Sequence, residues 1–185
     1  MVDLRGMLRV ELEKLRGPVA VFGAGGFIGA NLFRSVLGVR DDCFGVTHRE
    51  NVPWRLVGLP AESLLRCDVR DRASLQLLFD RFGFKTIFDL AAYGAYPSQE
   101  DVSLVYETNV LGLSNLLGVA CRAGCAAFVH AGASSEYGLN CRAPREDAEL
   151  LPNSHYAASK VSASYILRYC GSLRKQPVIN LRFYS

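Results

Sequence analysis

The segment GAGGFIGA, residues 23–30, constrains the fold more than any other part of the sequence, because it joins a short apolar run to a helical pattern. Three glycines at this spacing allow a tight turn, a close approach of the backbone to a pyrophosphate, and close packing of the helix on the strand. The free N–H groups at the start of the helix then favour the negative phosphate. A turn with only a structural role is the alternative. The residues predicted to contact a nucleotide here are Gly23, Gly26, Phe27, Ile28 and Gly29.

Apolar strand patterns and helical patterns alternate along the rest of the chain. Strands are predicted over 18–22, 43–49, 64–69, 85–93, 126–133 and 177–184, and helices over 27–38, 72–83, 102–124 and 154–173. This alternation predicts βαβ units and therefore an α/β fold, a Rossmann-like doubly wound parallel sheet with helices on both faces. An amphipathic helix is predicted over 3–16. The expected organisation is an N-terminal helical extension, 1–17, followed by a nucleotide-binding Rossmann-like domain, 18–185.

The composition suits one soluble globular domain. The 185 residues are 50% hydrophobic and 21% charged, and the net charge of +3 is spread along the chain. Since the basic residues are scattered, no nucleic-acid partner is expected. No apolar stretch approaches about 18 residues, and charges mix into the first residues, so we expect no membrane span, no secretory signal and a cytoplasmic location. The cysteines form no C-x-x-C pair, and no metal site is expected.

The end of the second predicted strand bears on which dinucleotide binds. An Asp or Glu there would bond the ribose 2′-hydroxyl of NAD. This strand instead ends Thr47-His48-Arg49, with no carboxylate and with an arginine that suits a 2′-phosphate. NADP is therefore favoured over NAD, with Arg49 as a cofactor contact. The alternative is that Arg49 is a solvated surface charge.

The segment YAASK places Tyr156 and Lys160 four residues apart on a predicted helix, so they share one face. A phenol has a pKa of about 10, and an ammonium nearby favours the phenolate. A tyrosine tuned in this way can remove a hydroxyl proton while hydride leaves the neighbouring carbon. We predict that Tyr156 is a catalytic base and that Lys160 lowers its pKa. An exposed pair without function is the alternative.

Taken in order, these motifs resemble those of the extended short-chain dehydrogenase/reductases, and within them the NAD-dependent nucleotide-sugar epimerases and dehydratases. The resemblance runs from residue 18 to the C-terminus. It rests on the glycine turn and on the segments CDVRD, LAAYGAY, ETNVLGLSNLL, SSEYG, YAASK and LRFYS. It implies an enzyme that acts on a nucleotide sugar with NADP or NAD, and a homodimer formed through two helices. Members of the family continue beyond the LRFYS strand, so the C-terminal substrate lobe is expected to be largely absent from this chain.

The same resemblance implies further cofactor contacts. They are Asp68 and Val69, Ala91 and Ala92, Asn109, and Lys160 in a second role. The acid would contact the adenine, the two alanines would bring backbone alongside the cofactor, the asparagine would hold the proton-relay region, and the lysine would bond the nicotinamide ribose. Each has a structural alternative: a helix cap for Asp68, strand-end packing for the alanines, and a buried helix asparagine for Asn109.

The family's catalytic Ser or Thr lies four residues before the tyrosine of SSEYG, and this position is Ala133 here. That hydroxyl bonds the reacting sugar oxygen, and loss of a comparable donor costs on the order of 10² to 10³ in rate. Three explanations stay open: Ser134 turns inward and substitutes, the position is naturally altered, or the chain is an engineered Ser-to-Ala variant. The catalytic candidates therefore include Ser134 and Ala133.

The same segment bears on the reaction. Sugar dehydratases of this family carry acid–base side chains two and three positions before that tyrosine, where this chain has Ser135 and Ser134, and Glu136 comes one place too late. Elimination of water is therefore disfavoured and epimerisation leads, with dehydration or reduction as alternatives. The contrary hypothesis is a non-catalytic cofactor-binding or regulatory domain. Ala133 and the expected absence of a substrate lobe favour it, whereas the tyrosine and lysine oppose it.

Overall fold

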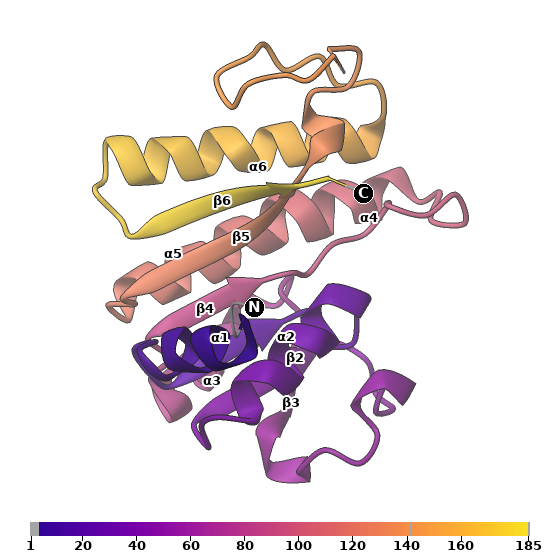
Figure 1. Cartoon of the computed structure of the whole chain (residues 1–185). Helices are drawn as coiled ribbons and strands as arrows, with labels where there is room; N and C mark the ends of the chain where they lie inside the picture. The colour runs from indigo at the N-terminus through magenta and orange to yellow at the C-terminus, as the bar shows by residue number, and fades with distance from the viewer. Residues whose placement is uncertain (1–3, 141, 185) are drawn as a thin grey trace.

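The computed structural model describes residues 4–140 and 142–184, and a parallel sheet of six strands runs through it (Figure 1). Its strands are β1 (Val19–Phe22), β2 (Cys43–Thr47), β3 (Leu64–Arg66), β4 (Thr86–Asp89), β5 (Ala127–Ala133) and β6 (Val178–Phe183). They pair in the order β3-β2-β1-β4-β5-β6. Strands β2 and β3 are added on one side of β1, and β4, β5 and β6 on the other, so the strand order switches between β1 and β4. Open α/β sheets bind ligands at the carboxyl ends of the strands beside such a switch point.

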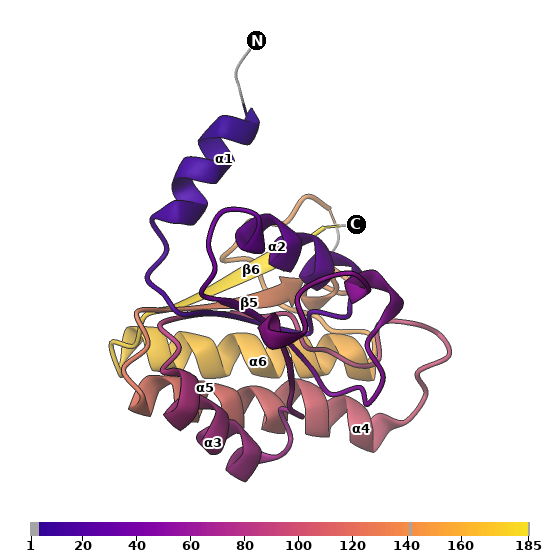
Figure 2. The ribbon, with the colours of Figure 1, turned by 90° about the horizontal axis from the view of Figure 1, so that it is seen from below.

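Helices cover both faces of the sheet (Figure 2). They are α1 (Leu4–Glu13), α2 (Phe27–Leu37), α3 (Arg72–Phe82), α4 (Val102–Tyr106), α5 (Leu113–Arg122) and α6 (His155–Ser172). In Figure 2, α2 lies on one face, and α3, α5 and α6 lie on the other. The predicted Rossmann-like doubly wound fold is confirmed. Cover is incomplete at β6, where Ile179, Leu181 and Phe183 alternate with less exposed residues and face outward.

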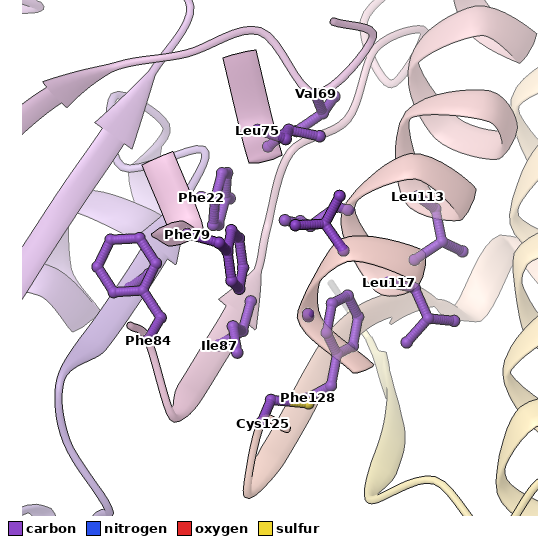
Figure 3. Packing of buried hydrophobic residues seen from close by; sticks show 14 of the residues in the cluster. Phe22, Val69, Leu75, Phe79, Phe84, Ile87, Leu113, Leu117, Cys125 and Phe128 are labelled. Atoms are coloured by element: carbon purple, nitrogen blue, oxygen red, sulfur yellow. The ribbon is translucent and has the colours of Figure 1, made fainter. Parts of the chain in front are cut away.

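The two helical layers enclose two apolar clusters. The larger one lies between the sheet and the layer of α3, α5 and α6, where the Phe79 and Phe84 rings meet edge-on with centroids 5.3 Å apart (Figure 3). The smaller one lies under α2, and Leu12 of α1 joins it. All four residues of β1 are buried because both of its faces are covered, which explains its unbroken apolar run. This rigid central strand leads directly into the glycine turn.

The long helix predicted over 102–124 is interrupted. Between α4 and α5 the backbone widens into a π-helical turn, η3 (Glu107–Gly112), and Asn109 lies within it. Such turns occur mostly inside α-helices, frequently at functional sites. The strand predicted over 64–69 is also shorter and ends at Arg66, so Asp68 lies in the loop after it.

The stretch Val102–Arg122 is, by length and composition alone, long and apolar enough to cross a membrane. In this protein its C-terminal half packs into the core through Leu113, Leu116, Leu117, Val119 and Ala120. Core helices with this composition pass the same test, so the expected absence of a membrane span stays a prediction.

Candidate functional site

The glycine turn joins β1 to α2, and its first and third glycines have distinct steric requirements. Gly23 has a φ of +76°, and a Cβ added there would lie 2.6 Å from the backbone of Leu90. A Cβ on Gly29 would lie 2.3 Å from the carbonyl oxygen of Gly23. No side chain caps α2 at Gly26, so the first-turn N–H groups of this helix have no side-chain acceptor at the cap. The turn fits a phosphate at the helix N-terminus.

A cavity of about 400 Å³ opens from this turn along the carboxyl ends of β1, β2 and β4. It brings together many of the residues predicted to contact the cofactor. These are Gly23, Gly26, Phe27, Arg49, Asp68, Val69, Ala91 and Ala92. Ile28, Gly29, Asn109, Tyr156 and Lys160 do not line it, and neither do Ala133 and Ser134. The glycine turn, the mixed polar and apolar wall and the position at the switch point suit the adenosine and phosphate half of a dinucleotide.

Cations dominate the cavity wall beyond β2. Arg49 lines it beside His48, and Arg55 from the following loop adds a second guanidinium that sequence reasoning missed. The main-chain carbonyl of Arg55 accepts a hydrogen bond from the Arg34 side chain, which ties this loop to α2. The carboxylate of Glu50 does not line the cavity and instead lies 3.8 Å from Arg66.

Asp68 lines the same cavity. Its carboxylate accepts a hydrogen bond from the Arg70 guanidinium at 2.7 Å, and this interaction holds the pKa of Asp68 below its ordinary value. The alternative that Asp68 caps the next helix is wrong. Asp71 is the cap of α3, and its side chain accepts from the amides of Ala73 and Ser74. Asp68 therefore lines the cavity as a carboxylate that is already paired with Arg70.

Asn109 ties the loop after β4 to helix α6. Its side-chain oxygen accepts from the amide of Tyr93 at 2.9 Å, and its Nδ2 donates to the carbonyl of Tyr93 and to Ser159 Oγ, each at 2.8 Å. Ser159 in turn donates to the carbonyl of Tyr156 at 2.7 Å. Asn109 is thus a buried structural link, placed between the cavity wall and the helix of the catalytic candidates.

Lys160 is 2% exposed, which is rare for a lysine. Its Nζ donates to the carbonyl of Ala131 at 2.7 Å and lies 3.3 Å from His130 Nε2. Burial lowers the pKa of Lys160, partly opposed by the carboxylates of Asp89 and Glu136.

The environment of Tyr156 differs from the expectation. Burial, followed by the charge of Glu136, raises the pKa of Tyr156, and Lys160 is not among the causes of this shift. The predicted lowering by Lys160 is therefore wrong for this arrangement, in which the ammonium is directed at β5. The phenol is protonated at neutral pH.

The buried side chain of Glu136 binds the main chain at Ala133. The 3₁₀ turn η4 (Ser134–Glu136) follows β5, and Glu136 Oε1 accepts from the amide of Ala133 at 2.9 Å. Glu136 is fully buried, and its carboxylate is already paired with Arg182 at 2.7 Å. Ser134 is half-buried, whereas Ser135 Oγ is buried without a hydrogen-bond partner among the described residues.

The geometry can be compared with known proteins. The family model for the NAD-dependent epimerase/dehydratase family matches residues 19–185. The chain belongs to this family. It is 29% identical over 188 residues to UDP-glucuronate 4-epimerase 3 of Arabidopsis thaliana, a match that covers 95% of this chain and 44% of the relative. The chain therefore spans about half the length of the curated relatives it matches.

Solved structures agree with the fold. An epimerase from Methanothermobacter thermautotrophicus superposes with a TM-score of 0.85 at 22% identity, over 99% of this chain and 56% of that one. The Bordetella bronchiseptica enzyme WbmG, solved in complex with NAD, superposes with a TM-score of 0.77 at 23% identity, over 89% of this chain and 52% of that one. At these identities the likeness shows the fold alone.

Sequence reasoning missed two polar residues of this epimerase/dehydratase domain, Asp89 and His130. Both lie in strands made mostly of apolar residues, and their side chains are only 2% and 1% exposed. A polar side chain inside a covered parallel strand is unusual, and this was the available signal. Within residues 4–140 and 142–184, no group of three or more His, Cys, Asp or Glu side chains is placed to hold a metal ion.

Proposed function

We propose that this chain binds NAD(P) in the cavity at the glycine turn and carries the hydride-transfer half of a nucleotide-sugar epimerase. Tyr156 exchanges a proton with the sugar hydroxyl, and Lys160 donates a hydrogen bond to the nicotinamide ribose of the cofactor. A bound nicotinamide would supply the hydride acceptor and donor that transfer at a sugar carbon requires. Epimerases among the relatives support a UDP-linked sugar as the substrate class.

The observation that carries the proposal is the buried Lys160, four residues after Tyr156 on α6. Burying an ammonium is costly, and a core position needs no lysine. This one is held by the carbonyl of Ala131, near the carboxyl end of β5, and the cavity of the glycine turn lies at the same edge of the parallel sheet. A buried charge near a ligand cavity is a signature of a functional site.

The raised pKa of Tyr156 agrees with one half of this chemistry. A protonated phenol can donate to the sugar oxygen when hydride returns, while oxidation needs the phenolate. Glu136 is paired with Arg182. Ser134 and Ser135 supply no acid or base at the positions that dehydratases of the family use, which favours epimerisation over dehydration.

The first test is titration with NAD and NADP, followed by calorimetry. We propose that NADP binds more tightly, because Arg49 and Arg55 line the cavity without an opposing carboxylate at the end of β2. We expect Arg49→Gln and Arg55→Gln each to weaken NADP binding on the order of tenfold, the value of one charge-assisted hydrogen bond, and to leave NAD binding nearly unchanged.

Arg72→Gln is the matched control, because Arg72 is exposed on α3 and does not line the cavity. Tighter binding of NAD than of NADP would refute the preference and leave the cofactor site standing. A folded chain that binds neither dinucleotide would refute the cofactor site itself.

The alanine at 133 predicts a gain of function. Ala133 is half-buried at the end of β5, so a small side chain with a hydroxyl fits there. We expect Ala133→Thr to raise turnover of UDP-glucose or UDP-glucuronate on the order of 10² to 10³, the value of one preorganised donor to the reacting oxygen. Ala133→Val has the same shape without the hydroxyl and should not change turnover. Equal rates for the two variants would contradict the assignment.

A non-catalytic cofactor-binding domain is the second candidate, favoured by the methyl group at Ala133 and by the raised pKa of Tyr156. It predicts NAD(P) binding but no transfer of hydride to any nucleotide sugar, including in Ala133→Thr.

A homodimer also stays a proposal. Leu111, Tyr165 and Tyr169 are more than half exposed on the two helices that would form it.

A further inference from the structure

Asp89 and His130 form a buried pair beside Lys160. The two residues are register partners on the neighbouring parallel strands β4 and β5. Asp89 Oδ2 lies 2.7 Å from His130 Nδ1, and His130 Nε2 lies 3.3 Å from Lys160 Nζ. All three side chains are no more than 2% exposed. Carboxylate, imidazole and ammonium therefore form one continuous line from β4 to α6.

The protonation states in this line are determined by its two charged ends. A carboxylate accepts hydrogen bonds only, so His130 carries its proton on Nδ1 and donates it to Asp89. Nε2 then has a free lone pair, which accepts from the Lys160 ammonium. Burial and the Lys160 charge lower the pKa of His130, which keeps the ring neutral. One negative and one positive charge balance within the cluster.

The line also reaches the cofactor cavity at its other end. The second oxygen of Asp89, Oδ1, accepts from the amide of Ala91 at 3.3 Å, and Ala91 lines the cavity. An ammonium has three N–H donors. In the described part of the chain, Lys160 directs one at the carbonyl of Ala131 and one at His130, which leaves one for a ligand.

We propose that Asp89 and His130 are positioning residues that hold Lys160 ready for the cofactor. Asp89 selects the imidazole tautomer, and the imidazole then fixes the direction of the ammonium. This inference rests on the proposed role of Lys160, but the tautomer and the lysine geometry are testable without any cofactor. The charged groups that face Lys160 are Asp89 from β4 and Glu136 from η4, and Glu136 is already paired with Arg182.

A matched pair of variants separates two roles of His130: accepting a hydrogen bond from Lys160, and donating one to Asp89. In His130→Gln the side-chain amide reaches the place of Nε2 and can accept from Lys160. In His130→Asn it reaches the place of Nδ1 and can donate to Asp89 only. We expect His130→Gln to retain NAD binding within about threefold and His130→Asn to weaken it on the order of tenfold, the value of one charge-assisted hydrogen bond.

The second readout is the NMR signal of the Lys160 side chain, followed against pH in the free protein. It should keep its wild-type midpoint in His130→Gln and move in His130→Asn. Lys14, Lys85 and Lys175 are internal references, and Lys85 is the closest match because its ammonium also makes two hydrogen bonds within the protein, both to main-chain carbonyls. Wild-type behaviour of His130→Asn together with failure of His130→Gln would overturn the proposal, as would equal behaviour of the two.

The wild-type protein provides a measurement that does not depend on the folding of any variant. The ¹⁵N shifts of the His130 ring should show a protonated Nδ1 and an unprotonated Nε2, with the exposed His48 as the reference. A proton on Nε2 would overturn the proposal whatever the variants do. If the tautomer and the lysine signal behave as expected and no dinucleotide binds, the positioning cluster is correct and the proposed function has failed.

Discussion

Replacing Glu136 with alanine is expected to lower the free energy of unfolding by about 3–5 kcal/mol, the loss that follows when one partner of a buried ion pair is removed. Glu136 is fully buried and accepts from Arg182 Nε at 2.7 Å, from Ser164 Oγ, and from the amide of Ala133 at 2.9 Å. Truncation leaves three donors without their acceptor. Urea unfolding followed by circular dichroism measures the loss.

Two further variants test the cause. Glu136→Gln keeps the shape and some of the hydrogen bonds, so it should lose less than Glu136→Ala. Asp147→Ala removes an exposed partner of Arg145, whose side chain is 86% exposed, and should cost less than about 1 kcal/mol. If the losses in Glu136→Ala and Asp147→Ala are similar, the buried network does not stabilise the end of β5.

Tyr156→Phe is expected to reduce turnover of a nucleotide sugar on the order of 10² to 10⁴, the usual contribution of a positioned acid–base group. The phenol oxygen has no hydrogen-bond partner within the described residues, so its removal breaks no hydrogen bond of the protein. NAD(P) affinity and the midpoint of thermal unfolding should therefore stay near the wild-type values. Steady-state kinetics, calorimetry and a thermal melt measure the three quantities.

Tyr169→Phe is the matched control, because Tyr169 is 53% exposed on the same helix. The pH dependence gives a second check. Burial raises the pKa of Tyr156, so the phenol does not finish titrating in the neutral and mildly alkaline range. The fraction of phenolate therefore increases with pH throughout this range, and oxidation of the sugar by the wild type should speed up with it. Tyr156→Phe should lose this dependence. A variant that keeps both the rate and the pH dependence would remove Tyr156 from the mechanism.

The fold of this domain followed from local patterns in the sequence. Apolar runs of strand length alternate with helical periodicity, and the glycine triplet lies between the first strand and its helix, as the structure confirms. The steric reasons are local too. Gly23 needs a positive φ, and Gly29 packs against its carbonyl only six residues away. Patterns of this kind depend on residues that are close in the chain, so they can be predicted from the sequence without a structure.

The interruption of the long helix could not be predicted in this way. The stretch 102–124 has continuous helical periodicity, but the backbone widens around Asn109, whose side chain binds both main-chain groups of Tyr93 and the hydroxyl of Ser159. Those partners come from a loop and a second helix. Propensity says nothing of such contacts, because it reports on the helix alone.

The sequence by itself determined the α/β class, the glycine turn and the Tyr156–Lys160 spacing. Only the tertiary structure decided the surroundings of that pair. The register of β4 against β5 places Asp89 beside His130, and helix packing places Lys160 against both. It also decided that Tyr156 has a raised rather than a lowered pKa. The physical reason is that burial and charge depend on distances in space, and the residues that set them here are 30 and 41 positions apart in the chain.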